Sequence, residues 1–145
     1  MQTLNYPITL EDDENGYKLI RFPDIDWAVT NGCGLDDILN QAQDCLEMAL
    51  SSMMKNGEPI PTPSPAKGRY TVSPSPSLAM KLMIAISLRE QGITQTDLAQ
   101  RLNTPKPEIN RILNPNHPTK IQRLEQALAI LGKRVKLSFH ETEPA

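Results

Sequence analysis

The sequence has few aromatic residues and no long apolar segment. Aromatic residues make up only 4% of its 145 positions, so aliphatic side chains must form most of the core. No stretch approaches the roughly 20 apolar residues that a membrane-spanning helix requires, and the N-terminus lacks the pattern of a signal peptide. These absences favour a protein that stays in the cytoplasm.

Cysteine and histidine are also scarce. Cys33 and Cys45 are the two cysteines, and His117 and His140 are the two histidines. Their positions do not follow the spacing of a zinc site, and the chain has no glycine-rich phosphate loop. We therefore expect free thiols in a reducing compartment, with Cys45 buried on a helix, and neither a metal nor another cofactor.

Charge is divided unevenly along the chain, although its formal net charge is only −2. Residues 1–77 contain five Lys or Arg and eleven Asp or Glu, a net of −6, whereas residues 78–145 contain ten and six, a net of +4. An acidic half and a basic half predict two different partners. The basic half suits the phosphates of nucleic acid, and the acidic half suits a basic protein.

The first half predicts three strands. Residues 4–10 alternate between apolar and polar, and Pro7 indicates an edge position or an irregularity. A polar, acidic turn at 11–16 leads into residues 17–22, so the two segments should form a hairpin. Residues 27–30 predict a short third strand.

Residues 35–56 show the clearest helical periodicity of this half. Asp36 and Asp37 lie in the first turn, where the helix dipole favours negative charge. Three strands and one helix predict an α+β domain over residues 1–62, with the helix across one face of the sheet. The expected inward-facing residues of the helix are Leu35, Ile38, Leu39, Ala42, Leu46, Ala49, Leu50 and Met53.

Proline marks the boundary that follows this domain. Six of the 13 prolines lie between residues 58 and 76, which predicts a stiff, extended linker over residues 63–76. Within this segment, residues 69–72 could add a fourth short strand beside the hairpin.

Residues 77–145 predict an all-helical domain with four helices. We expect Ser77 to cap the first helix and Gly92 to end it. Thr94 should cap the second helix, with Asp97 in its first turn. Asn103 then serves as a turn residue, because Asn tolerates a left-handed backbone.

The third and fourth helices have start signals of their own. We expect Thr104 to cap the third, with Pro105 at its first position. Thr119 and Gln122 have the spacing of a capping box for the fourth. The expected inward-facing residues of the four helices are Leu78, Leu82, Ile86, Leu98, Ala99, Leu102, Ile109, Ile112, Ile121, Leu124, Leu128 and Leu131.

The short turn between the second and third helices predicts a helix-turn-helix that lies on DNA. Residues 93–102, followed by Ile109-Asn110-Arg111-Ile112, resemble the Cro/repressor family, which favours glycine where this chain has Asn103. In that docking Lys106, Pro107 and Asn110 would meet base edges in the major groove. The remaining candidate DNA-binding residues are Gln95, Thr96, Thr104, Arg111, Asn116 and Lys120.

Residues 134–139 alternate between polar and apolar, which predicts a strand with no partner in its own domain. An isolated strand is not stable, so we expect it to pair with its copy in a second chain through Val135, Leu137 and Phe139. Two third helices would then lie about one turn of DNA apart, ~34 Å, on an inverted-repeat operator.

The order of motifs in the first half resembles the HicB antitoxins. That order is Tyr6-Pro7, an acidic turn, Gly16-Tyr17, Phe22-Pro23-Asp24-Ile25, Thr30-Asn31-Gly32, a helix, and Gly57-Glu58-Pro59-Ile60-Pro61-Thr62-Pro63-Ser64. The resemblance implies a partial RNase H-like N-terminal domain and, in one branch, a Cro-like DNA-binding domain. It also implies a HicA-type toxin, a small basic RNA-cleaving protein, as partner, and repression of the antitoxin's own operon.

The candidate toxin-binding residues are Asp24, Asp26 and Trp27. An exposed tryptophan beside acidic residues suits a basic partner, but a core tryptophan is an equally good interpretation of the sequence. The sequence also leaves open whether dimers pair further into tetramers.

Two other functions compete with this one. An active RNase H-like nuclease needs several carboxylates on adjacent strands around two metal ions, and residues 4–10 contain no acidic residue, so we expect no enzyme activity. The second alternative is a stand-alone transcriptional repressor whose N-terminal domain oligomerises or senses another signal.

Overall fold

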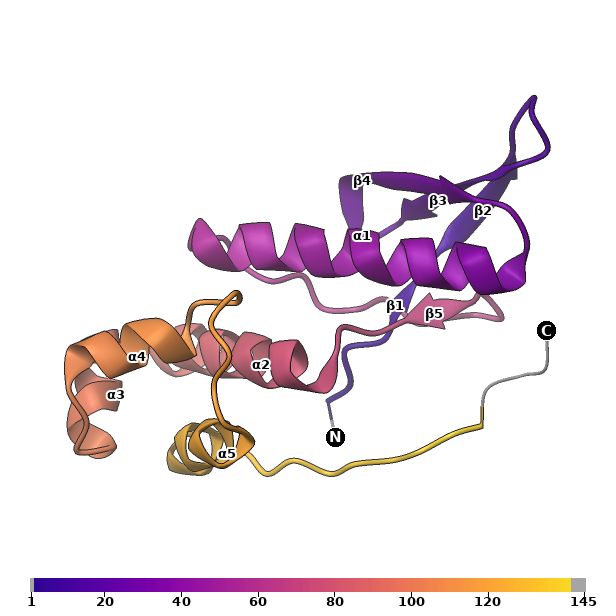
Figure 1. The fold of residues 1–145 in the computed structure, drawn as a ribbon. Coiled ribbons are helices and arrows are strands. Elements are labelled where there is room, and N and C mark those ends of the chain that lie inside the picture. Colours follow the sequence, from indigo (N-terminus) through magenta and orange to yellow (C-terminus); the bar gives the residue numbers. More distant parts are fainter. Residues whose placement is uncertain (1, 142–145) are drawn as a thin grey trace. The chain divides into compact units, whose positions relative to one another are not determined.

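The computed structural model describes residues 2–141, which form a mixed α/β architecture with five helices and two small antiparallel sheets. Figure 1 gives the order of the elements. These residues divide into two compact units: residues 2–50 with Pro61–Ser75, and Ser51–Ile60 with residues 76–141. No helix in this part of the chain has both the length and the apolar character needed to cross a bilayer.

The first unit contains a three-stranded sheet with the order β2-β3-β4. Strand β2 (Thr9–Asp12) pairs antiparallel with β3 (Lys18–Phe22), which confirms the predicted hairpin. Strand β4 (Ile25–Gly32) is longer than the predicted strand, and its pairing with β3 shifts register between Arg21 and Phe22. The regular pairing is interrupted there, because Arg21 pairs with Val29 whereas Phe22 pairs with Ile25.

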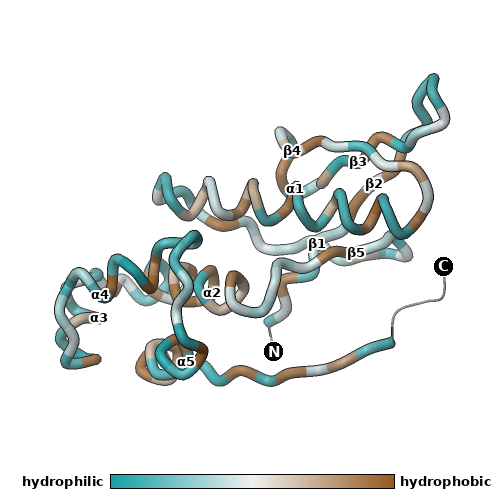
Figure 2. The backbone as a smooth tube through the Cα atoms, in the orientation of Figure 1, coloured by the Kyte–Doolittle hydropathy of each residue, from teal (hydrophilic) through white to brown (hydrophobic). Residues whose placement is uncertain are grey.

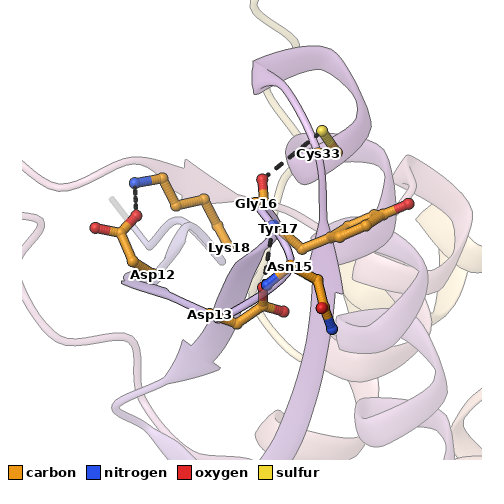
Figure 3. Close-up of polar contacts among 7 residues, drawn as sticks. All are labelled: Asp12, Asp13, Asn15, Gly16, Tyr17, Lys18 and Cys33. Atoms are coloured by element: carbon orange, nitrogen blue, oxygen red, sulfur yellow. Dashed lines mark hydrogen bonds and ion pairs between the residues drawn. The ribbon is translucent and has the colours of Figure 1, made fainter.

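The tip of the hairpin is closed by Asp13. Its Oδ1 atom accepts hydrogen bonds from the backbone N–H groups of Asn15 at 2.8 Å and Tyr17 at 3.1 Å, while Lys18 pairs with Asp12 (Figure 3). Asp side chains stabilise turns in this way because they bind backbone donors a few residues further on. The acidic turn therefore has a structural role in addition to its charge.

The N-terminal strand differs from its prediction, since it is split at Ile8. Strand β1 (Tyr6–Pro7) pairs with β5 (Thr71–Val72) in a separate two-stranded sheet, whereas β2 pairs with β3. Pro7 has no N–H to donate, and the next donor, Ile8 N, bonds to Tyr70 O at 2.9 Å. The predicted fourth strand therefore exists, but its partner is β1 and not the hairpin.

Helix α1 (Leu35–Lys55) confirms the predicted helix and lies along the three-stranded sheet in Figure 1. Its fully buried residues include Ala42 and Leu46. Gly32, at the end of β4, lies against its first turn, since an added Cβ would come within 3.0 Å of the Ile38 Cα. Leu35, which the periodicity placed inward, is 37% exposed because it is the first residue of the helix.

The second unit contains four further helices: α2 (Pro76–Gln91), α3 (Gln95–Arg101), α4 (Lys106–Ile112) and α5 (Ile121–Ile130). Their aliphatic side chains form one core, as the low aromatic content predicted. Ile121 is the clearest exception among the expected inward-facing residues, with 44% exposed. The core residues are Met80, Ile84, Leu88, Leu98, Ala99, Ile109, Ile112, Leu124, Ala127, Leu128 and Leu131.

Two of the predicted helix ends are confirmed in detail. Thr94 caps α3, and a capping box joins it to Asp97, with Asp97 N donating to Thr94 Oγ1 at 3.0 Å. Gly92, just after α2, has φ of +64°, a left-handed value that glycine adopts without strain.

Three predicted helix starts are wrong. Helix α2 begins at Pro76, one residue before Ser77. Pro105, and not Thr104, is the N-cap of α4. Helix α5 has Lys120 as N-cap with no side-chain cap bond, so the predicted capping box of Thr119 and Gln122 does not form. In the last two cases the threonine hydroxyl is engaged by a basic side chain of another helix, as described below.

Residues 134–139 form no strand within the single chain. Figure 2 shows hydrophobic and hydrophilic residues alternating along this segment after α5. Val135, Leu137 and Phe139 are 41%, 71% and 92% exposed. Their pairing with a second chain stays a prediction.

Candidate nucleic-acid interface and acidic surface

The connection between α3 and α4 consists of only four residues, 102–105. Asn103 reverses the chain with φ of +51°, the left-handed conformation that the sequence predicted for it. Thr104 N then donates to Ala99 O at 2.9 Å, which satisfies a carbonyl at the end of α3. A turn this short and this fully hydrogen-bonded holds the two helices in one relative orientation.

Helix α4 has one buried side and one exposed side. Ile109 and Ile112 are completely buried in the core, whereas Lys106, Asn110 and Arg111 are exposed. Of the other predicted DNA-binding residues, all but Thr104 are exposed: Gln95, Thr96, Pro107, Asn116 and Lys120.

Thr104 has a structural role at the start of α4. Its hydroxyl donates to Leu102 O at 3.0 Å and accepts a hydrogen bond from the Arg123 guanidinium of α5. Arg123 thereby ties α5 to the turn before α4. The sequence pattern missed this hydrogen bond because the two residues lie 19 positions apart.

Arg111 is paired within its own helix. Its Nη1 lies 3.0 Å from Glu108 Oε2, three residues earlier, and both side chains are partly exposed. The pair places a negative charge beside one of the expected phosphate-binding cations, so Glu108 opposes the positive field of this surface.

The segment between α4 and α5, residues 113–120, is organised around Lys81 of α2. Lys81 is 2% exposed, and its Nζ lies within 3.1 Å of four oxygen atoms of this region. Burial lowers the pKa of the Lys81 ammonium from its ordinary value. Sequence reasoning missed this residue, although a single lysine between Met80 and Leu82 in an otherwise apolar run was a signal for it.

On the first unit, Trp27 is exposed. It lies in β4 and is 57% exposed, with Val29 of the same strand at 41%. Asp26 beside it is also exposed. Of the two interpretations that the sequence left open, the surface tryptophan is therefore correct, and it forms an apolar patch next to a carboxylate.

Asp24 differs from the exposed Asp26 and Trp27, because it is partly buried and hydrogen-bonded. Its carboxylate accepts from the Ser64 backbone N–H at 2.9 Å and from the Ser64 hydroxyl. Nearby, the Tyr6 hydroxyl donates to Pro61 O at 2.8 Å. Burial, with a smaller effect of the Asp24 charge, raises the pKa of Tyr6. These hydrogen bonds fix the proline-rich segment onto the first unit.

Both cysteines are free thiols. Cys33 is exposed, and Cys45 is only half-buried on α1, where burial raises the pKa of its thiol. Among residues 2–141 no group of three or more His, Cys, Asp or Glu is arranged to hold a metal ion.

Comparison with known proteins agrees with the motif order in the first half. A family model described as a HicB-like antitoxin of bacterial toxin–antitoxin systems matches residues 5–88. The chain belongs to this family of HicB-like antitoxins. The family resemblance predicted from its motifs is therefore confirmed, and the match extends from just before β1 to Leu88, three residues before the end of α2.

Several relatives of this HicB-like antitoxin align over nearly its whole length. Antitoxin HicB 2 of Photorhabdus laumondii is 35% identical over 94% of this chain and 96% of its own. Antitoxin HicB of Escherichia coli strain K12 is 33% identical over 92% of this chain and 98% of its own. Antitoxin HicB 1 of Photorhabdus laumondii is 33% identical over 96% of this chain and 89% of its own. The similarity thus includes the helical second unit.

Proposed function

We propose that this HicB-like antitoxin neutralises a small basic, RNA-cleaving toxin of the HicA type through its first unit. We further propose that it represses its own operon by binding an inverted-repeat operator through α3 and α4, which would act as a helix-turn-helix. In this proposal the first unit has the partial RNase H-like fold without its catalysis, and the protein acts in the cytoplasm by binding alone.

The division of charge between the two units is the observation that carries this proposal. Within residues 2–141, the first unit has four Lys or Arg and ten Asp or Glu, a net of −6, and the second has eleven and six, a net of +5. Complementary potentials speed association and suppress wrong partners. An acidic unit suits a cationic RNA-binding protein, and a basic unit suits a duplex.

The exposed side of α4 supports the DNA-binding half of the proposal. Lys106, Pro107 and Asn110 would meet base edges, since they lie in the first five residues of the helix that is expected to enter the groove. Asn suits adenine and Lys suits guanine. Gln95 and Thr96, at the start of α3, would donate to phosphates.

The exposed segment after α5 supports a dimer. Val135, Leu137 and Phe139 alternate with polar residues, and exposed apolar residues in such a pattern need a partner strand. Two copies of residues 134–139 would form an antiparallel pair and bring two α4 helices to one operator. Further pairing of dimers into tetramers is compatible with this arrangement.

The experiment that tests the proposal is co-expression with the neighbouring gene, followed by sizing of the complex with and without promoter DNA. We expect a small basic protein to co-purify, its RNA cleavage to be blocked, and the complex to shift the promoter fragment. A chain that binds the promoter but leaves such a toxin active would support a stand-alone repressor instead. Failure of the chain to bind its own promoter would refute the proposed DNA-binding function.

A further inference from the structure

Lys81 is one of two polar or charged side chains that are buried among the described residues, the other being Ser87. It lies in the middle of α2, surrounded in sequence by apolar residues. Its Nζ reaches the main-chain oxygens of Arg111 at 3.1 Å, Asn114 at 2.8 Å and His117 at 2.8 Å, and the Thr119 hydroxyl at 2.8 Å. A buried ammonium needs such a set of acceptors, because it has lost its water.

All four oxygens belong to the end of α4 or to the segment that follows it. Arg111 O is one of the last carbonyls of α4, which lack partners within the helix. The segment itself also contains Asn116 N bonded to Asn114 Oδ1 at 3.0 Å and His117 N bonded to Asn114 O at 3.1 Å. These are short-range turns, whereas Lys81 joins three residues of the segment to the helical core.

The same segment carries two of the expected phosphate-binding side chains. Asn116 lies between the Asn114 and His117 carbonyls that Lys81 binds, and Lys120 directly follows Thr119. Both side chains are exposed. Lys81 therefore holds the backbone on both sides of Asn116 and next to Lys120, and this determines the positions from which these two side chains extend into solvent.

We propose that Lys81 is a positioning residue for DNA binding: it holds residues 113–120 in the conformation in which Asn116 and Lys120 reach the phosphates. This inference rests on the proposed DNA-binding function. Lys81 touches no DNA in this arrangement, because it is enclosed by the core. Removing its charge should therefore act on the interface through the segment that it holds.

The test uses full-length Lys81→Met, since Met keeps the length and apolar stem of lysine without the ammonium. Affinity for the protein's own promoter fragment is measured over a series of salt concentrations, at a temperature where every variant is folded. We expect affinity to fall about 10-fold or more. The salt slope should become shallower by about 1, because Lys120 no longer neutralises a phosphate. Leu131→Ala, a core change at the end of α5, is the matched control for stability and should leave the salt slope unchanged.

A double variant separates positioning from general weakening. If Lys81 acts through Lys120, then Lys120→Ala should have much less effect in the Lys81→Met background than in wild type. Should Lys81→Met not fold, Thr119→Val serves in its place, because it removes one of the four acceptors and leaves the ammonium; it should change the slope in the same direction, but less.

Three results would overturn the inference while leaving the proposed function intact. The first is a wild-type salt slope in Lys81→Met, or in Thr119→Val if Lys81→Met does not fold. The second is a change of salt slope in Leu131→Ala as large as that in Lys81→Met. The third is additivity, in the double variant, of the losses in binding free energy caused by Lys81→Met and Lys120→Ala. If the wild-type protein does not bind its own promoter, the proposed DNA-binding function is wrong, and the inference that rests on it is wrong as well.

Discussion

The carboxylate of Asp24 accepts a hydrogen bond from the Ser64 backbone N–H at 2.9 Å, across 40 positions of sequence. The residue lies in the short turn between β3 and β4, and it binds the Ser64 hydroxyl as well. The proline-rich segment therefore has a defined anchor on the first unit. These hydrogen bonds make Asp24 a stabilising residue, and Asp26 and Trp27 the better candidates for binding a partner.

Asp24→Ala should destabilise the first unit, because it leaves the partly buried Ser64 N–H without its acceptor. We expect a decrease of about 2 kcal/mol in the free energy of unfolding and faster proteolysis of residues 61–66. Denaturant unfolding and limited proteolysis measure the two effects. The matched control is Asp26→Ala, an exposed carboxylate two residues away, which should change stability by less than about 0.5 kcal/mol. Equal effects of the two substitutions would contradict this role for Asp24.

Trp27→Ala should weaken toxin binding with little effect on folding. An exposed tryptophan at the centre of an interface contributes about 2 kcal/mol or more, or roughly 30-fold in affinity. Calorimetry with the co-purified basic protein measures the change, and thermal unfolding checks that stability is retained. Tyr70→Ala removes a comparably exposed aromatic ring, 49% against 57%, and should leave binding near wild type. If Trp27→Ala binds the toxin with wild-type affinity, Trp27 does not contribute to the interface.

Asn110→Ala and Lys120→Ala should weaken DNA binding in different ways. Removing a side chain that binds a base edge costs about 1–3 kcal/mol at one operator position, whereas removing one that binds a phosphate weakens all sequences alike and reduces the salt slope by about 1. Titration against the operator, single-base variants of it and unrelated DNA distinguishes the two. Gln100→Ala, on an exposed position of α3, is the control. If both variants bind the operator like wild type, the docking of α4 is wrong.

Glu108→Gln should strengthen DNA binding. The substitution removes a negative charge from the proposed interface and releases Arg111 from a pair with an N···O distance of 3.0 Å. We expect operator affinity to rise by roughly 1 kcal/mol at low salt, and the gain to shrink at high salt because the interaction is exposed. Glu125→Gln changes net charge equally from α5 and should have a smaller effect. An unchanged affinity for Glu108→Gln would show that Arg111 does not bind the phosphates.

The stability of the first unit should fall in alkaline solution because of Tyr6. Burial raises the pKa of this phenol above its ordinary value of 10.0. Above about pH 10 the unfolded chain therefore loses this proton while the folded chain keeps it, so the unfolding free energy decreases as pH rises toward the folded pKa. Tyr6→Phe should be less stable at neutral pH, since it lacks the bond to Pro61 O, but its stability should depend less steeply on pH above 10. Denaturant unfolding between pH 8 and 11 compares the two slopes.

Local signals predicted much of this fold, because the forces concerned act over a few residues. The hairpin of β2 and β3, the helix α1 and the cap of α3 at Thr94 all depend on short-range periodicity or spacing. The exposed and buried sides of α4 were predicted for the same reason. The positive φ of Asn103 followed from its residue type and its place between two helices.

Three of the errors share one cause, which is interaction between residues far apart in sequence. Thr104 and Thr119 have the local spacing of helix caps, but Arg123 and Lys81 from other helices engage their hydroxyls. The strand predicted over residues 4–10 divides at Ile8, where its backbone bonds to Tyr70. None of these three partners lies within ten residues of the position that it changes.

The sequence by itself determined the family, the contrast between an acidic and a basic half, and the positions of most helices and strands. These follow from composition, motif order and the periods of helix and strand, which residues carry individually or with near neighbours. Only the tertiary structure decided that Trp27 is exposed, that Asp24 anchors residue 64, and that a buried lysine organises the segment after α4. Burial and long-range hydrogen bonds arise when distant segments pack together, so no local pattern specifies them.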